Sequence, residues 1–153
     1  MRFQLWHVPL RAVTGAFILN SGLSKLKTDD EEVHKHIHEM ASNAYPQFGS
    51  VQPATFTKAL GAGEVALGAA LLTPFVGPGL AGAGLTAFSG GLLGLYFKLP
   101  GMTTDGIRPS PQGLPLAKDT WMLGIGLALM LDRASKKVRS AIPSMPAIPS
   151  LHS

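Results

Sequence analysis

Long apolar stretches alternate with shorter polar ones along this chain, and their lengths predict membrane-spanning helices. Crossing the hydrocarbon core takes about 20 residues of helix, with a range of roughly 17–25. Four stretches approach this length, and we expect helices over about 8–26, 56–76, 79–99 and 114–131. The turn "FVGPG" is so short that the second and third helices must run antiparallel. The pattern predicts an all-α fold, a four-helix transmembrane bundle.

A polar stretch lies between the first two apolar ones. In "TDDEEVHKHIHEMASNAY" the acidic residues suit a helix start, and apolar residues then recur at helical spacing. We expect an amphipathic interfacial helix over about 30–44, lying on the membrane surface and ended by Pro46. The prolines of "SAIPSMPAIPSLHS" predict an extended or disordered tail over 140–153. Residues 1–139 then form the membrane domain.

Charge is scarce and unevenly spread. Charged residues make up 14% of the chain, against about a quarter in an average soluble domain. None falls between Glu64 and Lys98, and none between Asp119 and Asp132. The net charge of +4 is too scattered to indicate nucleic-acid binding, and the absence of cysteine excludes disulfides and thiolate metal sites. The composition therefore favours a multi-pass integral membrane protein, with the lipid bilayer as its first partner. We expect a bacterial cell membrane as its location.

The first stretch is the least apolar of the four, because it holds Arg11, Asn20 and Lys25. A secretory signal peptide is the alternative, but the uncharged part is short and no A-x-A cleavage site follows. Four spans place both termini on one side, and the basic cluster within 133–139 favours the cytoplasmic side. Aromatic residues at the expected interfaces are interpreted as anchors: Trp6, Tyr96, Phe97 and Trp121.

Small residues recur at helical spacing in the predicted spans. Ala62, Ala66 and Ala70 fall four apart, and Gly15 and Gly22 share one face of the first helix. Such rows let helices approach closely, and van der Waals packing holds helices together in lipid. We therefore expect a compact bundle.

Glu64 stands in the apolar run "KALGAGEVALGAALL" and needs a partner inside the bundle. It lies seven residues after Thr57, or roughly 10 Å deep at 1.5 Å per residue. Asn20 reaches the same depth, Lys25 can reach down to it, and Arg11 lies near the opposite surface. The other helices bring residues to the same end, which gives a predicted polar cluster of Asn20, Lys25, Glu64, Lys118 and Asp119. Its role is either a Glu64–Lys25 bridge that fixes helix register or a group that responds to a ligand or proton.

Three histidines lie in "HKHIHE", within the predicted interfacial helix. Only His34 and His38 share a helix face, at the i, i+4 spacing that a metal chelate needs. We therefore predict no metal site and keep these two as weak candidates. A pH-responsive helix and an ordinary solvated helix are the other interpretations.

Together these segments resemble the DoxX-like family of small four-helix membrane proteins. "RAVTGAFILNSGLSKL" carries the pattern of that family's first helix, "QPATFTKALGAGEVALGAALL" its helix with one glutamate after a proline, and "LAKDTWMLGIGLALML" its closing helix with a Lys-Asp entry. The resemblance covers about residues 8–132. It implies either a subunit similar to that of a thiosulfate:quinone oxidoreductase or a scaffold without chemistry of its own.

Three functions follow as hypotheses. The first is an accessory subunit or assembly factor of a larger membrane complex, which catalyses nothing alone and binds another membrane protein. The second is a quinone- or thiosulfate-linked redox subunit that uses Lys25, Glu64 and Lys118. A quinone is the one cofactor that this hypothesis implies. The third is a small transporter, which ranks last because a polar cluster in one leaflet gives no continuous polar path.

Overall fold

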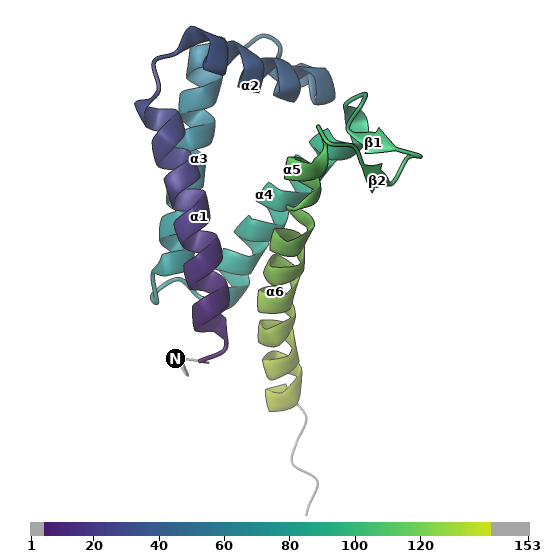
Figure 1. The fold of residues 1–153 in the computed structure, drawn as a ribbon. Helices are drawn as coiled ribbons and strands as arrows, with labels where there is room; N and C mark the ends of the chain where they lie inside the picture. The colour runs from purple at the N-terminus through teal and green to yellow at the C-terminus, as the bar shows by residue number, and fades with distance from the viewer. Residues whose placement is uncertain (1–4, 142–153) are drawn as a thin grey trace, which may run out of the picture.

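The computed structural model describes residues 5–141, with side chains up to residue 135, and this part of the chain is mostly helical. The elements are α1 (His7–Lys27), α2 (Glu31–Ala44), the 3-10 turn η1 (Pro46–Phe48), α3 (Pro53–Leu72), α4 (Pro78–Lys98), β1 (Thr103–Thr104), β2 (Arg108–Pro109), α5 (Leu114–Ala117) and α6 (Thr120–Ala141). Helix α1 packs against α3, and α4 against α6 (Figure 1). Helix α2 lies across one end of both pairs, and α1 begins and α6 stops at the other end.

Glycines bring α1 and α3 into backbone contact. A Cβ atom added at Gly22 would lie 2.6 Å from the carbonyl oxygen of Gly61, and one at Gly68 would lie 2.7 Å from the amide nitrogen of Leu19. No side chain fits in that space, so only glycine allows the two helices this approach. The predicted row of Gly15 and Gly22 is therefore a packing seam, and its counterpart on α3 is Gly61 and Gly68.

A second seam joins α4 to α6. A Cβ atom at Gly82 would lie 2.7 Å from the carbonyl oxygen of Gly126.

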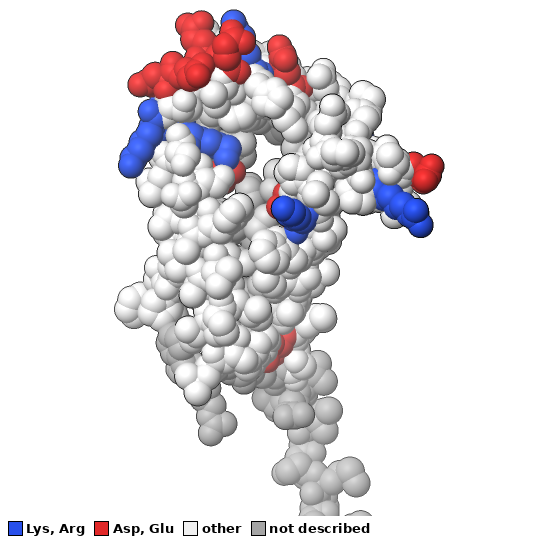
Figure 2. Space-filling view, viewed as in Figure 1, with Lys and Arg blue, Asp and Glu red and all other residues white. Residues whose placement is uncertain are grey.

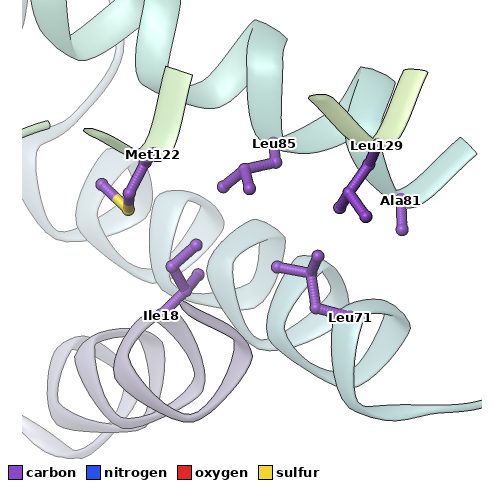
Figure 3. Close-up of a cluster of buried hydrophobic side chains, with 6 residues drawn as sticks. All are labelled: Ile18, Leu71, Ala81, Leu85, Met122 and Leu129. Atoms are coloured by element: carbon purple, nitrogen blue, oxygen red, sulfur yellow. The ribbon is translucent and has the colours of Figure 1, made fainter. Parts of the chain in front are cut away.

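Buried apolar side chains connect the two helix pairs (Figure 3). All four long helices contribute to this cluster: Ile18, Leu71, Ala81, Leu85, Met122 and Leu129. Near the opposite end from α2, His7 Nε2 on α1 lies 3.4 Å from Asp132 Oδ2 on α6.

Helix α2 is fastened to both pairs. Its N-cap residue Asp30 accepts a hydrogen bond from the amide of Glu32 at 2.9 Å. The ring of His38 packs against the ring of Phe56 on α3, with the two ring centroids 5.6 Å apart. At its other end, the hydroxyl of Tyr45 donates to the carbonyl of Gly91 on α4 at 2.9 Å. Lys98 donates to the carbonyl of Ala44 at 3.2 Å. The amphipathic helix expected over 30–44 is present, with its charged side facing outward (Figure 2).

Several predicted boundaries differ from the structure. Helix α3 ends at Leu72 instead of 76, because Thr73 precedes a proline and is extended, with ψ 127°. The helix expected over 114–131 is two helices, with the break at Lys118 and Asp119. Helix α6 then continues to Ala141, because the Ala, Lys and Arg residues that follow the apolar run are good helix formers. The tail expected over 140–153 lies outside the described residues from 142 onward.

A small β-hairpin occupies the loop before α5, where no strand was predicted. Strands β1 and β2 pair antiparallel, with Thr104 opposite Arg108. Asp105 and Gly106 turn the chain with φ of 56° and 80°, a left-handed conformation that favours such Asp-Gly pairs. The hydroxyl of Tyr96 donates to the carbonyl of Ile107 at 2.7 Å. Tyr96 is buried, so it fastens this hairpin to α4 instead of acting as an exposed anchor.

Two helical stretches within the described residues are long and apolar enough to cross a membrane. They are Pro78–Lys98 and Leu114–Ser135, and only 33% and 17% of their most apolar windows are buried. A core helix of a soluble protein would be mostly buried, so this exposure favours contact with lipid. The prediction of four spans is met in part, because α1 and α3, with 21 and 20 residues, are long enough but less apolar than the same standard requires.

Candidate functional site

The predicted partner of Glu64 is in place. Lys25 Nζ on α1 donates to Glu64 Oε2 on α3 at 2.9 Å, and the two side chains are 19% and 4% exposed. Lys25 also donates to the hydroxyl of Ser21 at 2.8 Å. Glu64 shares its face of α3 with the seam glycines Gly61 and Gly68, so the carboxylate is directed at α1 by the same packing that joins the two helices.

This arrangement leaves hydrogen-bonding capacity at Lys25. An ammonium group has three N–H donors, and Ser21 and Glu64 take two of them. The charge of Lys25 is compensated by Glu64, so the remaining donor belongs to a pair that is close to neutral. Such a pair can fix the register of α1 against α3 and can also offer a donor to a bound acceptor.

A pocket of about 490 Å³ adjoins this ion pair. Its polar lining comes from α1 and the turn that follows: Asn20, Ser21, Ser24, Lys25 and Thr28. Phe17 of α1 and Val33 of α2 supply the apolar lining. The volume falls within the range of small-molecule sites, roughly 300–1,000 Å³. On the face drawn in Figure 2 the surface is hollowed beneath α2, and Lys or Arg atoms lie at the edge of the hollow.

The predicted five-residue cluster divides into two groups. Asn20, Lys25 and Glu64 lie together at the α1–α3 pair and its pocket. Lys118 and Asp119 lie at the break between α5 and α6, where Lys118 is exposed and Asp119 is half-buried. Among the described residues, no hydrogen bond or ion pair joins Lys118 or Asp119 to the other three. The expectation that all four helices build one polar cluster is therefore not met, because equal depth along two helices does not bring their side chains together.

The histidines of α2 do not converge on a metal site. His34 is buried at 5% exposure, whereas His38 Nε2 lies 2.9 Å from the carbonyl oxygen of Phe48, and His36 is exposed. Within the residues the structure describes, no group of three or more His, Cys, Asp or Glu side chains is placed to hold a metal ion. Nε2 of His38 is engaged by the α2–η1 turn, and the expectation of no metal site stays a prediction.

Sequence reasoning missed the role of Arg11. Arg11 is 9% exposed, and its guanidinium lies over the end of α3. Arg11 Nε donates to the carbonyl of Leu71 at 2.8 Å. One Nη, which has two N–H groups, lies within hydrogen-bond distance of three further carbonyls, those of Ala70, Thr73 and Val76, at 2.9, 2.8 and 3.1 Å, so one N–H is shared. The last carbonyls of a helix have no partner within the helix, so Arg11 satisfies the end of α3 and the turn into α4.

Lys58 also satisfies backbone carbonyls at a helix end, at the other end of the α1–α3 pair. It donates to the carbonyls of Leu26 and Thr28 at 2.8 and 2.7 Å, and it lies 3.2 Å from Asp29 Oδ1. A cation at a helix C-terminus also meets the negative end of the helix dipole. The Lys and Arg residues of α1 and α3, apart from Lys27 in the last turn of α1, are Arg11, Lys25 and Lys58. Each of these three therefore bonds to the partner helix or to the turn that flanks it.

Comparison with protein-family models, with curated proteins and with solved structures finds no significant match to this chain.

Proposed function

We propose that α1, α3, α4 and α6 all cross the bilayer, and that the chain is an accessory subunit or assembly factor of a larger membrane complex, of the DoxX-like kind. Support for insertion comes from where charge and apolar surface lie. On the face shown in Figure 2, charged atoms gather at the α2 end and the body of the bundle is almost free of them. Large apolar side chains face outward along the pairs, including Val13, Phe17, Leu80 and Leu131.

The polar groups of α1 and α3 do not oppose insertion, because they are satisfied within the protein. A charged group that faces lipid has a high free-energy cost, but one that is paired or hydrogen-bonded to backbone carbonyls inside a bundle is tolerated. Arg11 has four carbonyl partners, Lys25 has Glu64 and Ser21, and Lys58 closes the end of α1. The charged residues lower the mean hydropathy of these two helices. Because those residues have partners inside the protein, the helices suit a membrane better than their composition indicates.

The outward face of α3 is the observation that carries the accessory role. While Gly61 and Gly68 pack against α1, the exposed side of α3 is built almost entirely from small residues: Ala59, Ala62, Gly63, Ala66 and Ala69. A Cβ atom at Gly63 would meet nothing within 4 Å. In lipid, helices associate through faces of this kind, because small residues allow close backbone contact. This face fits a transmembrane helix of another subunit.

Our first prediction concerns topology. Single cysteines at Ser50, Asp105 and Ser135 of this cysteine-free chain should label from two sides of the membrane. Ser50 follows α2 and Asp105 is in the β-hairpin, at the same end of the bundle, whereas Ser135 is near the end of α6. We expect a membrane-impermeant maleimide to reach Ser50→Cys and Asp105→Cys from one side and Ser135→Cys from the other.

The three positions separate the alternatives. If only α4 and the α5–α6 stretch span the membrane, the chain up to Pro78 stays on the side of the α6 end, and Ser50→Cys labels together with Ser135→Cys. If the chain does not insert, all three label from the outside of any vesicle to which it binds. Either pattern would exclude the four-span arrangement.

A second prediction tests the outward face of α3. The double substitution Ala62→Leu/Ala66→Leu should leave the bundle stable within about 0.5 kcal/mol, since both positions are exposed. It should nevertheless release a stoichiometric partner that wild-type protein retains in mild detergent. Gly63→Cys should crosslink to that same partner. Purification from the native membrane followed by mass spectrometry measures both results.

The matched control is Ala12→Leu/Ala16→Leu, which adds the same two side chains, four residues apart, on the exposed side of α1. It should retain the partner. Equal retention by both double variants would show that α3 is not the contact surface. A wild-type chain that comes from its own membrane without any stoichiometric protein would argue against the accessory role itself.

A further inference from the structure

The pocket beside Lys25 has the profile of a site for an amphiphile. Its polar lining extends over α1 from Asn20 to Thr28. On the same face of α1 the lining becomes apolar at Phe17, and the next residue along that face is Val13. Phe17 and Val13 are 62% and 63% exposed. A polar recess that continues into an exposed apolar stripe suits a molecule with a polar head and an apolar tail.

The recess is rich in donors suited to a phosphate or an ester carbonyl. Lys25 keeps one N–H beyond those bonded to Ser21 and Glu64. The side chain of Asn20 is exposed, lines the recess and makes no hydrogen bond within the described residues, so its amide is available to a ligand. Lysine, asparagine and hydroxyl side chains are common ligands of phosphate oxygens. These groups together could hold the glycerophosphate part of a lipid.

Four consecutive carboxylates lie in the chain between two residues that line the recess. Thr28 and Val33 both line the pocket, and the residues between them are Asp29, Asp30, Glu31 and Glu32. Lys58 pairs with Asp29, and Lys35 pairs with Glu32. Asp30 and Glu31 have no ion pair among the described residues. This excess of negative charge repels an anionic headgroup and attracts an ammonium group.

We propose that this pocket binds a zwitterionic glycerophospholipid, such as phosphatidylethanolamine. Its phosphate and ester groups meet Asn20 and Lys25, its ammonium group is attracted by Asp30 and Glu31, and an acyl chain follows Phe17 and Val13. The inference rests on the proposed membrane insertion, because the stripe faces lipid only in that arrangement. The lipid then joins α1 to α2, which covers the recess through Val33.

Lipid titration with native mass spectrometry tests this assignment. Detergent-purified, delipidated protein is titrated with palmitoyl-oleoyl phosphatidylethanolamine, phosphatidylcholine or phosphatidylglycerol. We expect one lipid to bind in preference to further lipids, with both zwitterionic lipids favoured over phosphatidylglycerol. Equal or tighter binding of phosphatidylglycerol would overturn the proposal. Recovery of a quinone or another non-lipid from the pocket, with no lipid bound tightly, would also overturn it.

Two variants connect the preference to named residues. Asp30→Asn/Glu31→Gln keeps the N-cap acceptor, because asparagine caps as well as aspartate. It should reduce the preference for phosphatidylethanolamine over phosphatidylglycerol by roughly 2- to 30-fold, as two exposed charge pairs would. Asn20→Leu should weaken binding of the single tight lipid by about 10-fold or more, as loss of a hydrogen bond to a charged group does.

Matched controls separate these effects from general ones. Glu39→Gln/Asp105→Asn removes two exposed carboxylates that lie outside the 29–32 segment between the lining residues Thr28 and Val33. Asn43→Leu makes the same change as Asn20→Leu on the exposed side of α2. Both controls should bind lipid as the wild type does. Cysteine labelling that shows four spans, combined with no lipid preference, would refute the lipid site and leave the insertion intact. A protein that fails to insert would refute both.

Discussion

Removing one partner of the Lys25–Glu64 pair should destabilise the bundle by about 3–5 kcal/mol, the range for breaking a buried ion pair. Glu64→Leu and Lys25→Met should be similarly harmful, because each leaves a charge without its partner. Glu64→Gln should be milder, since the amide oxygen can still accept a hydrogen bond from Lys25. Thermal unfolding in one detergent measures all of these variants.

The double variant Lys25→Met/Glu64→Leu decides whether the pair is directly coupled. It removes both charges, so it should be more stable than the sum of the two single effects predicts. Ser21→Ala serves as the control for the surrounding hydrogen bonds, because it removes only the second acceptor of Lys25. Simple additivity would mean that the contact contributes nothing to stability. If Glu64→Leu were also fully stable, the carboxylate would be kept for binding or another function.

The positions of the helices could be predicted because apolar runs and helix breakers are both local signals. The cores of α1, α2, α3 and α4 fall where the pattern places them. Their ends depend on single residues, such as Pro74 after α3, and on helix-forming polar residues, such as those that extend α6 beyond the apolar run. The β-hairpin also had a local signal in the sequence, the Asp-Gly pair at 105–106, but two-residue strands are too short to show a pattern of their own.

The candidate site was predictable where one helix pair builds it. Antiparallel packing of α1 and α3 means that depth on one helix fixes depth on the other, and this reasoning correctly brought Lys25 to Glu64. The same reasoning failed for Lys118 and Asp119. Depth gives the position along the bundle axis, whereas contact also needs the lateral arrangement of the helices, and these two residues belong to the α4–α6 pair.

The roles of Arg11 and Lys58 were missed because their partners are backbone carbonyls. A search for ion-pair partners looks for a side chain of opposite charge, whereas Arg11 and Lys58 bond to backbone carbonyls. The usable signal was positional: in an antiparallel pair, a cation in the first turns of one helix lies beside the last turn of the other. Arg11 and Lys58 both occupy such positions, at opposite ends of the α1–α3 pair.

Arg11→Met should destabilise the bundle by about 3 kcal/mol or more, an effect comparable to removing one partner of the Lys25–Glu64 pair. Three N–H groups of Arg11 serve four carbonyls at the end of α3 and in the turn into α4. Each buried polar group left without a partner costs roughly 1–3 kcal/mol, and water can satisfy only the carbonyls nearest the surface. Thermal unfolding gives the overall loss, and hydrogen exchange of the 73–77 amides reports on the turn itself.

Two comparisons identify the cause of that loss. Arg11→Lys keeps the charge but offers a compact ammonium in place of a planar fork of donors, so it should recover only part of the stability. Arg133→Met removes an exposed arginine that lies against Gly77 and Gly79 at the same end of the bundle, and it should cost less than about 1 kcal/mol. Equal losses at Arg11 and Arg133 would assign the effect to positive charge at that end of the bundle. A large loss at Arg11 alone, with faster exchange in the 73–77 turn, would show that one side chain of α1 holds the α3–α4 connection in place and so fixes how the two helix pairs meet.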